Sequence, residues 1–349
     1  MKFMPQSSTT EIVGNLAWIQ KSRAMISLYS LRKQGKFGQT CDYDRALEIV
    51  RAINSAWDIS HWCFDWTAEM DLELCDDSER SSIFAVLHKR LIKPMREIVG
   101  DSPISLLHGD ADIAHRYENW LKIPGKRQQF YSVGHINRFI HHYYSTAYPD
   151  TPVTALPKRA YSTFNRKSTH YRSELYKYLE NNKLLDQGYV NFAFEKSCNL
   201  IRSFADDYEE HSRASENLIR DCYAASNFDI VIETATAEYN QRFITEKTLR
   251  ALALGQPFVV FSGPDSLRYL QGLGFKTYHD LWDERYDTME SSSERFANIL
   301  KIVHQLIVDP SVFDVNHSKL NEINEHNRNH FRELAKINHR DRWFENKII

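Results

Sequence analysis

The segment from Phe243 to Gly263, FITEKTLRALALGQPFVVFSG, constrains the fold of this 349-residue chain more than any other stretch does. A polar, charged turn opens a predicted helix, and Gly255 and Pro257 end it. The apolar run that follows predicts a buried strand. A helix followed by such a strand is the repeating unit of an open, mostly parallel sheet.

Ionisable side chains gather at the start of that helix. Thr245 is placed to act as the N-cap, and Glu246 and Lys247 fall in the first turn. Free backbone N–H groups at a helix start attract anions, so Lys247 beside them suits a diphosphate. The Glu246 carboxylate suits the two hydroxyls of a ribose. A simpler interpretation pairs Glu246 with Arg250 at i,i+4, which stabilises a helix by only a few tenths of a kcal/mol.

Two further turns follow predicted strands in the same half of the chain. One is NRKSTHYR, which comes directly after the strand AYSTF, and the other is the eleven-residue loop from Glu233 to Phe243. That loop is longer than the ~2–6 residues usual for such a connection. Ligands of open α/β sheets bind at the carboxyl ends of the strands. The three turns together give the candidate nucleotide-binding residues Asn165, Arg166, Arg172, Glu233, Thr245, Glu246 and Lys247. The alternative is that they are ordinary solvated surface.

Hydrophobic periodicity predicts an α/β protein with two domains and a tail. A Pro- and Thr-rich link at Tyr148–Arg159 marks the predicted domain boundary. Before it lies an N-terminal acceptor-side domain (1–155), and after it a Rossmann-like C-terminal domain with a parallel sheet (156–315). A helical tail (316–349) is expected to pack across both domains. The first half is predicted to be mostly helical, with one short strand. Its predicted elements are helices at Ala24–Lys33, Tyr43–Trp57 and Ser81–Val99, which Pro94 is expected to kink, and a strand at Pro103–Gly109.

Strands of the second half are predicted at Ala160–Phe164, Phe228–Thr236 and Phe275–Tyr278. Helices are expected at Tyr171–Asn182, near Pro264, and over the charged segment His317–Arg342, whose apolar positions suggest an interface. Strands separated by helices indicate a doubly wound sheet.

Composition narrows the class of protein. A net charge of −2 argues against a surface that is wholly a nucleic-acid footprint, although a local basic groove remains compatible with it. Five scattered cysteines without a C-x-x-C pair favour reduced thiols and a cytoplasmic location, and they give no zinc signature. The N-terminus lacks the apolar core of a signal peptide, and no stretch approaches the ~20 apolar residues needed to span a membrane.

Other patterns are weaker. Asp110 and Asp112 match the D-x-D pattern of metal-dependent sugar transferases, but two acids so spaced arise easily by chance. His135, His141 and His142 have no carboxylate or cysteine at ligand spacing, so no metal ligands are predicted. The chain contains no G-x-G-x-x-G, Walker-A or G-x-S-x-G motif, which weakens dehydrogenase, NTPase and hydrolase interpretations.

The stretch NRKSTHYRSELYKYLENNKLLDQGYVNF is similar to the segment that opens the C-terminal domain of α1,3-fucosyltransferase-like enzymes. FITEKTLRALALGQPFVVFSG resembles their donor motif, and LRYLQGLGFKTYHDLWDERYD resembles relatives encoded by phages and large viruses. The resemblance spans roughly Lys158–Asp287. It implies a GT-B glycosyltransferase of hexosyl or fucosyl type, with a GDP- or UDP-linked sugar as donor, no tightly bound cofactor and no metal. By position, Arg166, Arg172 and Lys247 would contact the diphosphate and Glu246 the ribose.

These expectations lead to one enzymatic hypothesis with alternatives. The enzyme would transfer a sugar to an acceptor hydroxyl in an interdomain cleft, with Asp110 or Asp112 as the base that deprotonates it. A glycan is the default acceptor. The alternative is a hydroxymethylated base of viral DNA, in the host cytoplasm, facing a groove with the basic residues Lys89, Arg90, Lys93, Arg96, Lys122, Lys126 and Arg127. A third possibility is an inactive transferase fold that serves as a binding module.

Overall fold

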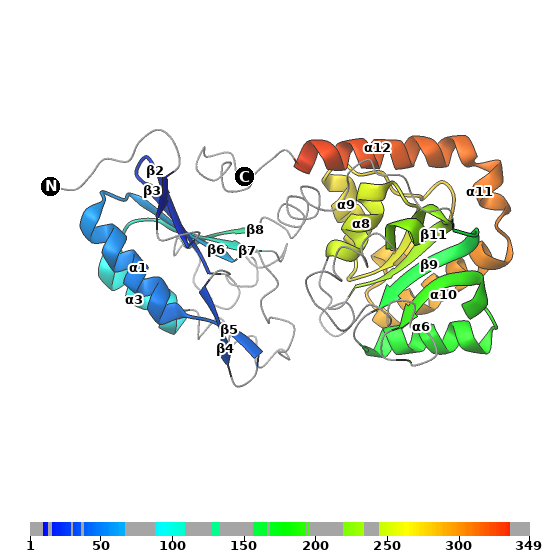
Figure 1. Cartoon of the computed structure of the whole chain (residues 1–349), viewed down its shortest axis with the longest axis horizontal. Helices are drawn as coiled ribbons and strands as arrows, with labels where there is room; N and C mark the ends of the chain where they lie inside the picture. Colours follow the sequence, from blue (N-terminus) through cyan, green and yellow to red (C-terminus); the bar gives the residue numbers. More distant parts are fainter. Residues whose placement is uncertain are drawn as a thin grey trace. The chain divides into compact units, whose positions relative to one another are not determined.

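A computed structural model describes residues 10–12, 16–28, 31–35, 38–66, 88–108, 128–132, 156–165, 168–192, 195, 219–233 and 244–335. The chain divides into two compact units (Figure 1). One contains Met1–Arg138 together with Asn338–Ile349, and the other contains Phe139–Ile337. The domain boundary near residue 155 and a tail that packs across both domains stay predictions.

The first unit is built on a six-stranded sheet in the order β1-β2-β3-β6-β7-β8. Its strands are β1 (Thr10–Ile12), β2 (Ala17–Gln20), β3 (Arg23–Ser27), β6 (His61–Trp66), β7 (Ile104–His108) and β8 (Gln128–Ser132). The first three strands pair antiparallel, and β3, β6, β7 and β8 run parallel. A separate hairpin joins β4 (Arg32–Gly35) to β5 (Gly38–Cys41).

Helices α1 (Tyr43–Ala56) and α3 (Lys93–Val99) complete the described part of this unit. The Asp42 side chain accepts a hydrogen bond from the backbone of Arg45 and so caps α1. The buried face of α1, with Leu47 and Val50, packs in one core with Trp62 and Phe64 of β6 and with Met95 of α3. This core holds the parallel strands in register.

The prediction of a mostly helical first half is wrong for the residues that the structure describes. The segment expected as a helix at Ala24–Lys33 forms part of β3 and of β4 instead. The β2–β3 turn lacks the Asn or Gly that usually marks a hairpin, and Lys21 adopts the left-handed conformation there with φ of 51°. Because the strands have only four and five residues, their alternation was too short to outweigh a helical pattern.

The other predictions for this half are better. Helix α1 confirms the helix at Tyr43–Trp57, and β7 confirms the strand at Pro103–Gly109. The helix expected at Ser81–Val99 is described from His88 onward. A π-helical turn (His88–Ile92) leads into α3, and Pro94 lies in the first turn of α3. Proline is tolerated in a first turn because the N–H that it lacks would have no intrahelical partner.

The second unit is a doubly wound α/β domain with an all-parallel sheet in the order β10-β9-β11-β12. Its strands are β9 (Arg159–Asn165), β10 (Gly188–Phe192), β11 (Ser226–Ile232) and β12 (Phe258–Phe261). Its α-helices are α6 (His170–Asn181), α8 (Glu246–Leu254), α9 (Ser266–Gly272), α10 (Ser292–Val308), α11 (Ser311–Val315) and α12 (His317–Ala335), with short 3₁₀ turns at Leu185–Gln187 and Arg285–Thr288. The parallel sheet predicted for the C-terminal half is confirmed.

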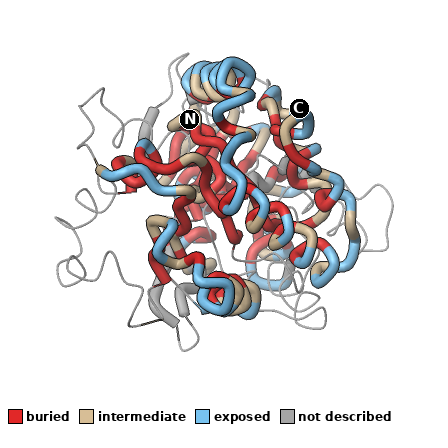
Figure 2. The backbone as a smooth tube through the Cα atoms, turned by 90° about the vertical axis from the view of Figure 1, so that its right-hand side faces the viewer, coloured by how far each residue is buried: buried red, intermediate tan, exposed pale blue. Residues whose placement is uncertain are grey.

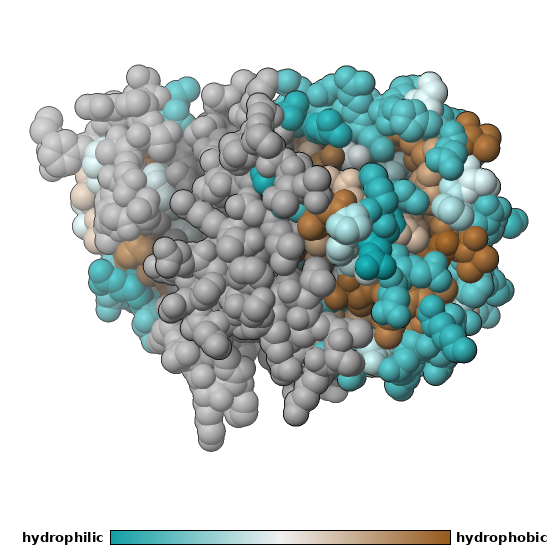
Figure 3. Space-filling view, turned by 45° about the vertical axis from the view of Figure 1, so that its right-hand side comes forward, coloured by the Kyte–Doolittle hydropathy of each residue, from teal (hydrophilic) through white to brown (hydrophobic). Residues whose placement is uncertain are grey.

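Helices cover both faces of this sheet. Helices α6 and α10 contact each other on one face, and α8 lies on the other face beneath α12 (Figure 1). Buried backbone runs through the middle of the unit, and exposed residues follow the outward sides of the helices (Figure 2). On the face drawn in Figure 3, hydrophilic side chains cover most of the described surface, and hydrophobic ones form separate patches. Among the described residues, no helix is both long and apolar enough to cross a membrane.

The strand predicted at Phe275–Tyr278 is wrong, because side chains bind the backbone groups that a strand would pair. Asn327 of α12 accepts from the Lys276 N–H at 2.8 Å and donates to the Lys276 carbonyl at 2.9 Å. The Tyr278 N–H donates to the Glu284 carboxylate. The predicted helix beyond His317 is confirmed as far as Ala335, and its residues 336–342 lie outside the described range.

Gly255 ends α8 in the left-handed conformation, with φ of 63°. A Cβ atom there would lie 2.8 Å from the Asn324 carbonyl oxygen and 2.8 Å from Nη2 of Arg328, both on α12. We therefore expect Gly255→Ala to lower the free energy of unfolding by about 1–3 kcal/mol, from strain and from a disturbed α8–α12 contact.

Urea unfolding of the full chain measures this effect. Gly272→Ala is the matched control, because its φ is not in the left-handed region and a Cβ there would meet no atom within 4 Å. A Gly255→Ala variant as stable as the control variant would contradict the packing described for α8 and α12.

Candidate functional site

The parallel sheet of the second unit reverses its winding between β9 and β11. The connection through α6 leads from β9 to β10 on one side, and the connection through α8 leads from β11 to β12 on the other. The loops that leave β9 and β11 therefore diverge at their carboxyl ends. Such a switch point is where open α/β sheets bind their ligands.

The ladder between the two strands opens at this edge. The backbone register of β9 with β11 runs from Arg159↔Ser226 to Ser162↔Asp229, and both strands continue three residues further. Side chains then bind the β11 carbonyls. The Thr163 hydroxyl donates to the Ile230 carbonyl at 2.8 Å, and the Arg172 guanidinium donates to the Ile232 carbonyl at 2.8 Å from Nη2. Polar side chains therefore lie where the backbone pairing of the two strands ends.

Asn165, the last residue of β9, lies at this opening. Its side-chain nitrogen donates to the Thr163 hydroxyl at 3.0 Å. Its side-chain oxygen is buried and has no hydrogen-bond partner among the described residues. A buried polar atom without a partner is costly, so this oxygen is available to a ligand donor.

Glu233 follows β11 directly and is fully buried. Its Oε1 accepts from the Thr245 N–H at 2.9 Å and from the Thr248 hydroxyl at 2.7 Å, and its Oε2 accepts from the Thr245 hydroxyl at 2.5 Å. Burial of a carboxylate is unfavourable unless hydrogen bonds replace its hydration. These three bonds do so, and they fix the start of α8 against the end of β11.

Lys247 carries the positive charge of this cluster. Its Nζ donates to the Thr245 hydroxyl at 3.0 Å and to Oε1 of Glu246 at 2.9 Å, and it lies 3.7 Å from Oε2 of Glu233. The side chain is only 16% exposed. The ammonium group is therefore held beside the N-terminus of α8, where the helix dipole also favours an anion.

Glu246 is ionised near neutral pH, because its pKa is strongly lowered. Burial raises its pKa, but the charge and hydrogen bond of Lys247, together with the charge of Arg250, outweigh burial and hold the pKa at about 2. Its Oε1 receives Lys247, whereas its Oε2 is buried and has no hydrogen-bond partner among the described residues. An ionised oxygen with unused acceptor capacity suits a hydroxyl donor.

A second buried carboxylate lies beneath the site. Asp229 of β11 accepts from the Ser162 hydroxyl of β9 at 2.8 Å and from the Tyr223 hydroxyl at 2.7 Å. Burial raises its pKa to about 6, against those hydrogen bonds and the charge of Arg250. The charge of Arg250 thus lowers the pKa of both Asp229 and Glu246, so this cation interacts with a carboxylate of the sheet and with one at the helix start.

The structure brings most of the predicted nucleotide-binding residues to one edge of the sheet. Those that it describes are Asn165, Arg172, Glu233, Thr245, Glu246 and Lys247. Arg166 lies outside the described residues, and so do Asp110 and Asp112. Their roles in binding and catalysis stay predictions. The Glu233 carboxylate bonds the start of α8, and its role in nucleotide binding stays a prediction.

Sequence reasoning missed Thr248, Thr163 and Asp229. Thr248 follows the N-cap by three residues, a spacing that returns it to the same side of the helix. Thr163 and Asp229 lie inside the strands β9 and β11. Polar residues in a buried strand are a usable signal, because each needs a partner.

The basic residues considered for a DNA-facing groove are only partly described. Arg90 lies 3.2 Å from Asp44, and Arg96 donates to the carbonyls of Gly100 and Ser102. Lys89 and Lys93 are exposed. Lys122, Lys126 and Arg127 lie outside the described residues. Within the described ranges, no three His, Cys, Asp or Glu side chains gather in a metal-binding group.

No protein-family model matches the chain, and no curated protein is similar to it at a significant level. Among solved structures, it is similar to a mutant of T4 phage BGT in complex with UDP-glucose, with 10% identity, a TM-score of 0.31, and coverage of 82% of this chain and 77% of that one. A second T4 phage BGT complex with UDP-glucose gives 11% identity, a TM-score of 0.30, and coverage of 83% and 77%. TM-scores this low do not establish a shared fold.

Asp229 makes stability depend on pH. A carboxyl whose pKa is raised on folding stabilises the protein below its unfolded value near 3.8, and that stability is lost as pH rises through about 6. We expect Asp229→Asn to gain up to about 3 kcal/mol relative to the wild type between pH 4 and pH 7, since two pKa units correspond to about 2.7 kcal/mol.

Urea unfolding of both proteins across this pH range measures the difference. Asp314→Asn, at an exposed position of α11, is the control and should follow the wild-type curve. Parallel pH profiles for Asp229→Asn and the wild type would show that Asp229 does not titrate near pH 6 in the folded protein.

Proposed function

We propose that the protein is a glycosyltransferase that uses a nucleoside diphosphate sugar as its donor. The observation that carries the proposal is a set of hydrogen bonds in which Thr245 and Thr248 donate to the buried Glu233 carboxylate and Lys247 donates to Thr245. These bonds hold Lys247 and the start of α8 at the switch point of a parallel sheet. An ammonium group beside a helix N-terminus and an ionised carboxylate in one place fit a diphosphate joined to a ribose. The order of motifs in the sequence supports a GT-B transferase of fucosyltransferase-like type.

The residues have separate roles in this proposal. The departing nucleoside diphosphate gains negative charge as the sugar leaves, and Lys247, Arg172 and Arg166 stabilise it. Glu246 accepts hydrogen bonds from the ribose hydroxyls through Oε2, because Oε1 is occupied by Lys247. Glu233 does not touch the donor, and it acts through Thr245 and Lys247. No metal is required for this charge stabilisation, since three cationic side chains supply it.

The acceptor needs a base if the reaction inverts the anomeric centre. Strand β7 ends at His108, and Asp110 and Asp112 follow it closely in the chain. We propose that one of them removes the proton from the acceptor hydroxyl. Cys222 is a buried thiol outside any disulfide, which is compatible with the proposed cytoplasmic location.

Donor binding tests the proposal. We expect one of the GDP- or UDP-linked sugars to raise the melting temperature of the full chain, and a CMP-linked sugar, which has no diphosphate, to leave it unchanged. Lys247→Ala should weaken that donor about 10- to 100-fold, because a charge-assisted hydrogen bond to phosphate contributes roughly 1.5–3 kcal/mol. Lys301→Ala, at an exposed position of α10, removes the same charge elsewhere and should leave affinity unchanged.

Unchanged donor affinity in an Arg166→Ala plus Lys247→Ala double variant would show that the phosphate site lies elsewhere. Turnover separates the enzyme from an inactive binding module. Release of the nucleoside diphosphate from the donor, by hydrolysis or by transfer, indicates an enzyme. Tight binding with no release under any acceptor condition indicates the module.

A glycan is the first proposed acceptor, and a hydroxymethylated base of viral DNA is the second. Exposed Lys89 and Lys93 favour the second, whereas Arg90 and Arg96 are engaged in local contacts. If DNA is the acceptor, affinity for a hydroxymethylated duplex should fall steeply between 50 and 200 mM salt, by about 10³-fold for six phosphate contacts. The absence of duplex binding at low salt would eliminate the DNA acceptor and leave the glycan.

A further inference from the structure

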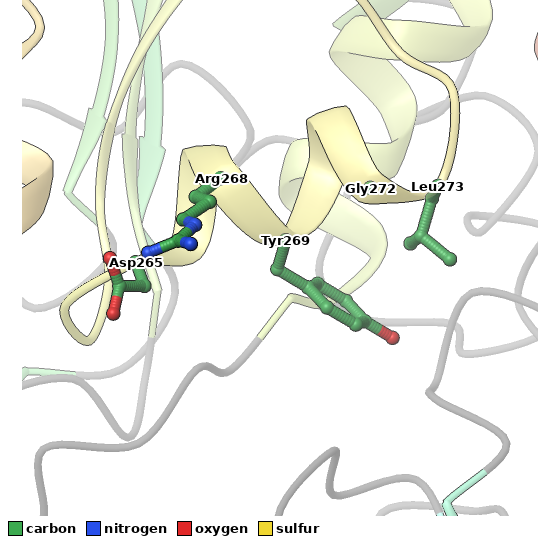
Figure 4. Close-up of a pocket in the computed structure, with 5 residues that line it drawn as sticks. All are labelled: Asp265, Arg268, Tyr269, Gly272 and Leu273. Atoms are coloured by element: carbon green, nitrogen blue, oxygen red, sulfur yellow. The ribbon is translucent and has the colours of Figure 1, made fainter.

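A cavity lies on α9. Its volume is about 380 Å³, and it is lined by Asp265, Arg268, Tyr269, Gly272 and Leu273 (Figure 4). The spacing of these residues, i, i+3, i+4, i+7 and i+8, places them on one face of the helix. Helix α9 follows β12, so the Asp265 end of the cavity lies toward the carboxyl edge of the sheet, and Leu273 lies at the other end of the helix.

The loop that precedes α9 is held in an unfavourable conformation. Asp265 has φ of 58°, a left-handed value that a non-glycine residue rarely adopts. Its N–H donates to the Asp287 carbonyl at 2.7 Å, and the buried Arg295 donates to the Ser262 carbonyl at 3.0 Å. Strained residues that their surroundings fix in this way cluster at binding sites.

The Asp265 carboxylate is not needed to cap α9, although it occupies the N-cap position. Asp287 caps the helix instead, because its two carboxylate oxygens accept from the N–H groups of Leu267 and Arg268 at 2.9 and 3.1 Å. Asp265 itself makes no side-chain capping bond. The fold therefore places a carboxylate at the cavity and satisfies the helix with another residue.

The lining suits a ligand with hydroxyl groups and a C–H surface. Asp265 and Arg268 lie at one end of the cavity, and the Tyr269 ring and Leu273 lie toward the other (Figure 4). A hydroxyl both donates and accepts, so neighbouring hydroxyls match a carboxylate beside a guanidinium. Gly272 keeps the middle open, since a Cβ there would meet no atom within 4 Å.

The start of α9 is linked to the end of β11. The Glu233 N–H donates to the Phe261 carbonyl at 3.0 Å, so the ends of β11 and β12 are joined. Asp265 follows Phe261 by four residues, which span at most about 14 Å.

We propose that this cavity binds the sugar of the donor, with Asp265 accepting hydrogen bonds from its hydroxyls and Tyr269 covering its C–H face. The inference rests on the proposed function, because it takes the diphosphate at Lys247 as its anchor. In this proposal the β12–α9 segment selects among donor sugars, and α8 recognises the nucleotide.

Binding of nucleotide and nucleotide sugar, measured separately by calorimetry on the full chain, tests the proposal. The probes are UDP against UDP-glucose and GDP against GDP-fucose. Gly272→Leu fills the cavity from a position with open space, and Asp265→Asn keeps a residue type that tolerates the left-handed conformation. Asp314→Asn is the control for loss of an exposed carboxylate.

We expect both variants to weaken the nucleotide sugar at least about tenfold, toward the affinity of the free nucleotide, and to leave the free nucleotide unchanged. Equal weakening of nucleotide and nucleotide sugar would place the nucleotide in the cavity and overturn the proposal. Unchanged binding of both ligands would also overturn it. Absence of nucleotide binding in the wild type would refute the proposed function instead, so the two failures are distinguishable.

Discussion

The buried carboxylate of Glu233 at the start of α8 is the contact on which the rest of the site depends. A fully buried carboxylate without partners would cost several kcal/mol, and the fold offsets this with one backbone N–H and two threonine hydroxyls. Each of those donors comes from the first turn of α8. The register of the helix start against the end of β11 is therefore set by electrostatics as well as by apolar packing.

That fixed start organises the charges around it. Lys247 is held between two carboxylates, and the charge of Arg250 lowers the pKa of both Glu246 and Asp229. Alternation of sign allows several ionisable groups to be buried near one another, because each charge lowers the cost of burying its neighbour. The same arrangement leaves one oxygen of Glu246 without a partner among the described residues, beside an ammonium group.

Two buried carboxylates position the starts of α8 and α9 at the carboxyl edge of the sheet. Glu233 accepts from the N–H of Thr245, the N-cap of α8, and Asp287 accepts from N–H groups in the first turn of α9. In each case a carboxylate from outside the helix fixes the helix start. The hydrogen bond from Glu233 to Phe261 joins the loops, and this link makes one continuous edge from β9 to α9.

The helix start at Thr245, the buried strand β12 and the parallel sheet around them were predictable from the sequence, because helical spacing, an N-cap and an apolar run are local signals. The hairpin of β2 and β3 was not predictable, since Lys21 gives no turn signal and its strands are short. The strand predicted at Phe275–Tyr278 is wrong for a different reason. Asn327, more than fifty residues away, binds the backbone there.

The sequence by itself determined which residue types gather near the carboxyl ends of the strands, because those positions follow from periodicity and from turns. Only the tertiary structure decided which of them contact one another. The Glu233 carboxylate, for example, accepts three hydrogen bonds from Thr245 and Thr248 at the start of α8. Partners of a buried charge come from distant segments, and local sequence does not encode which segments meet.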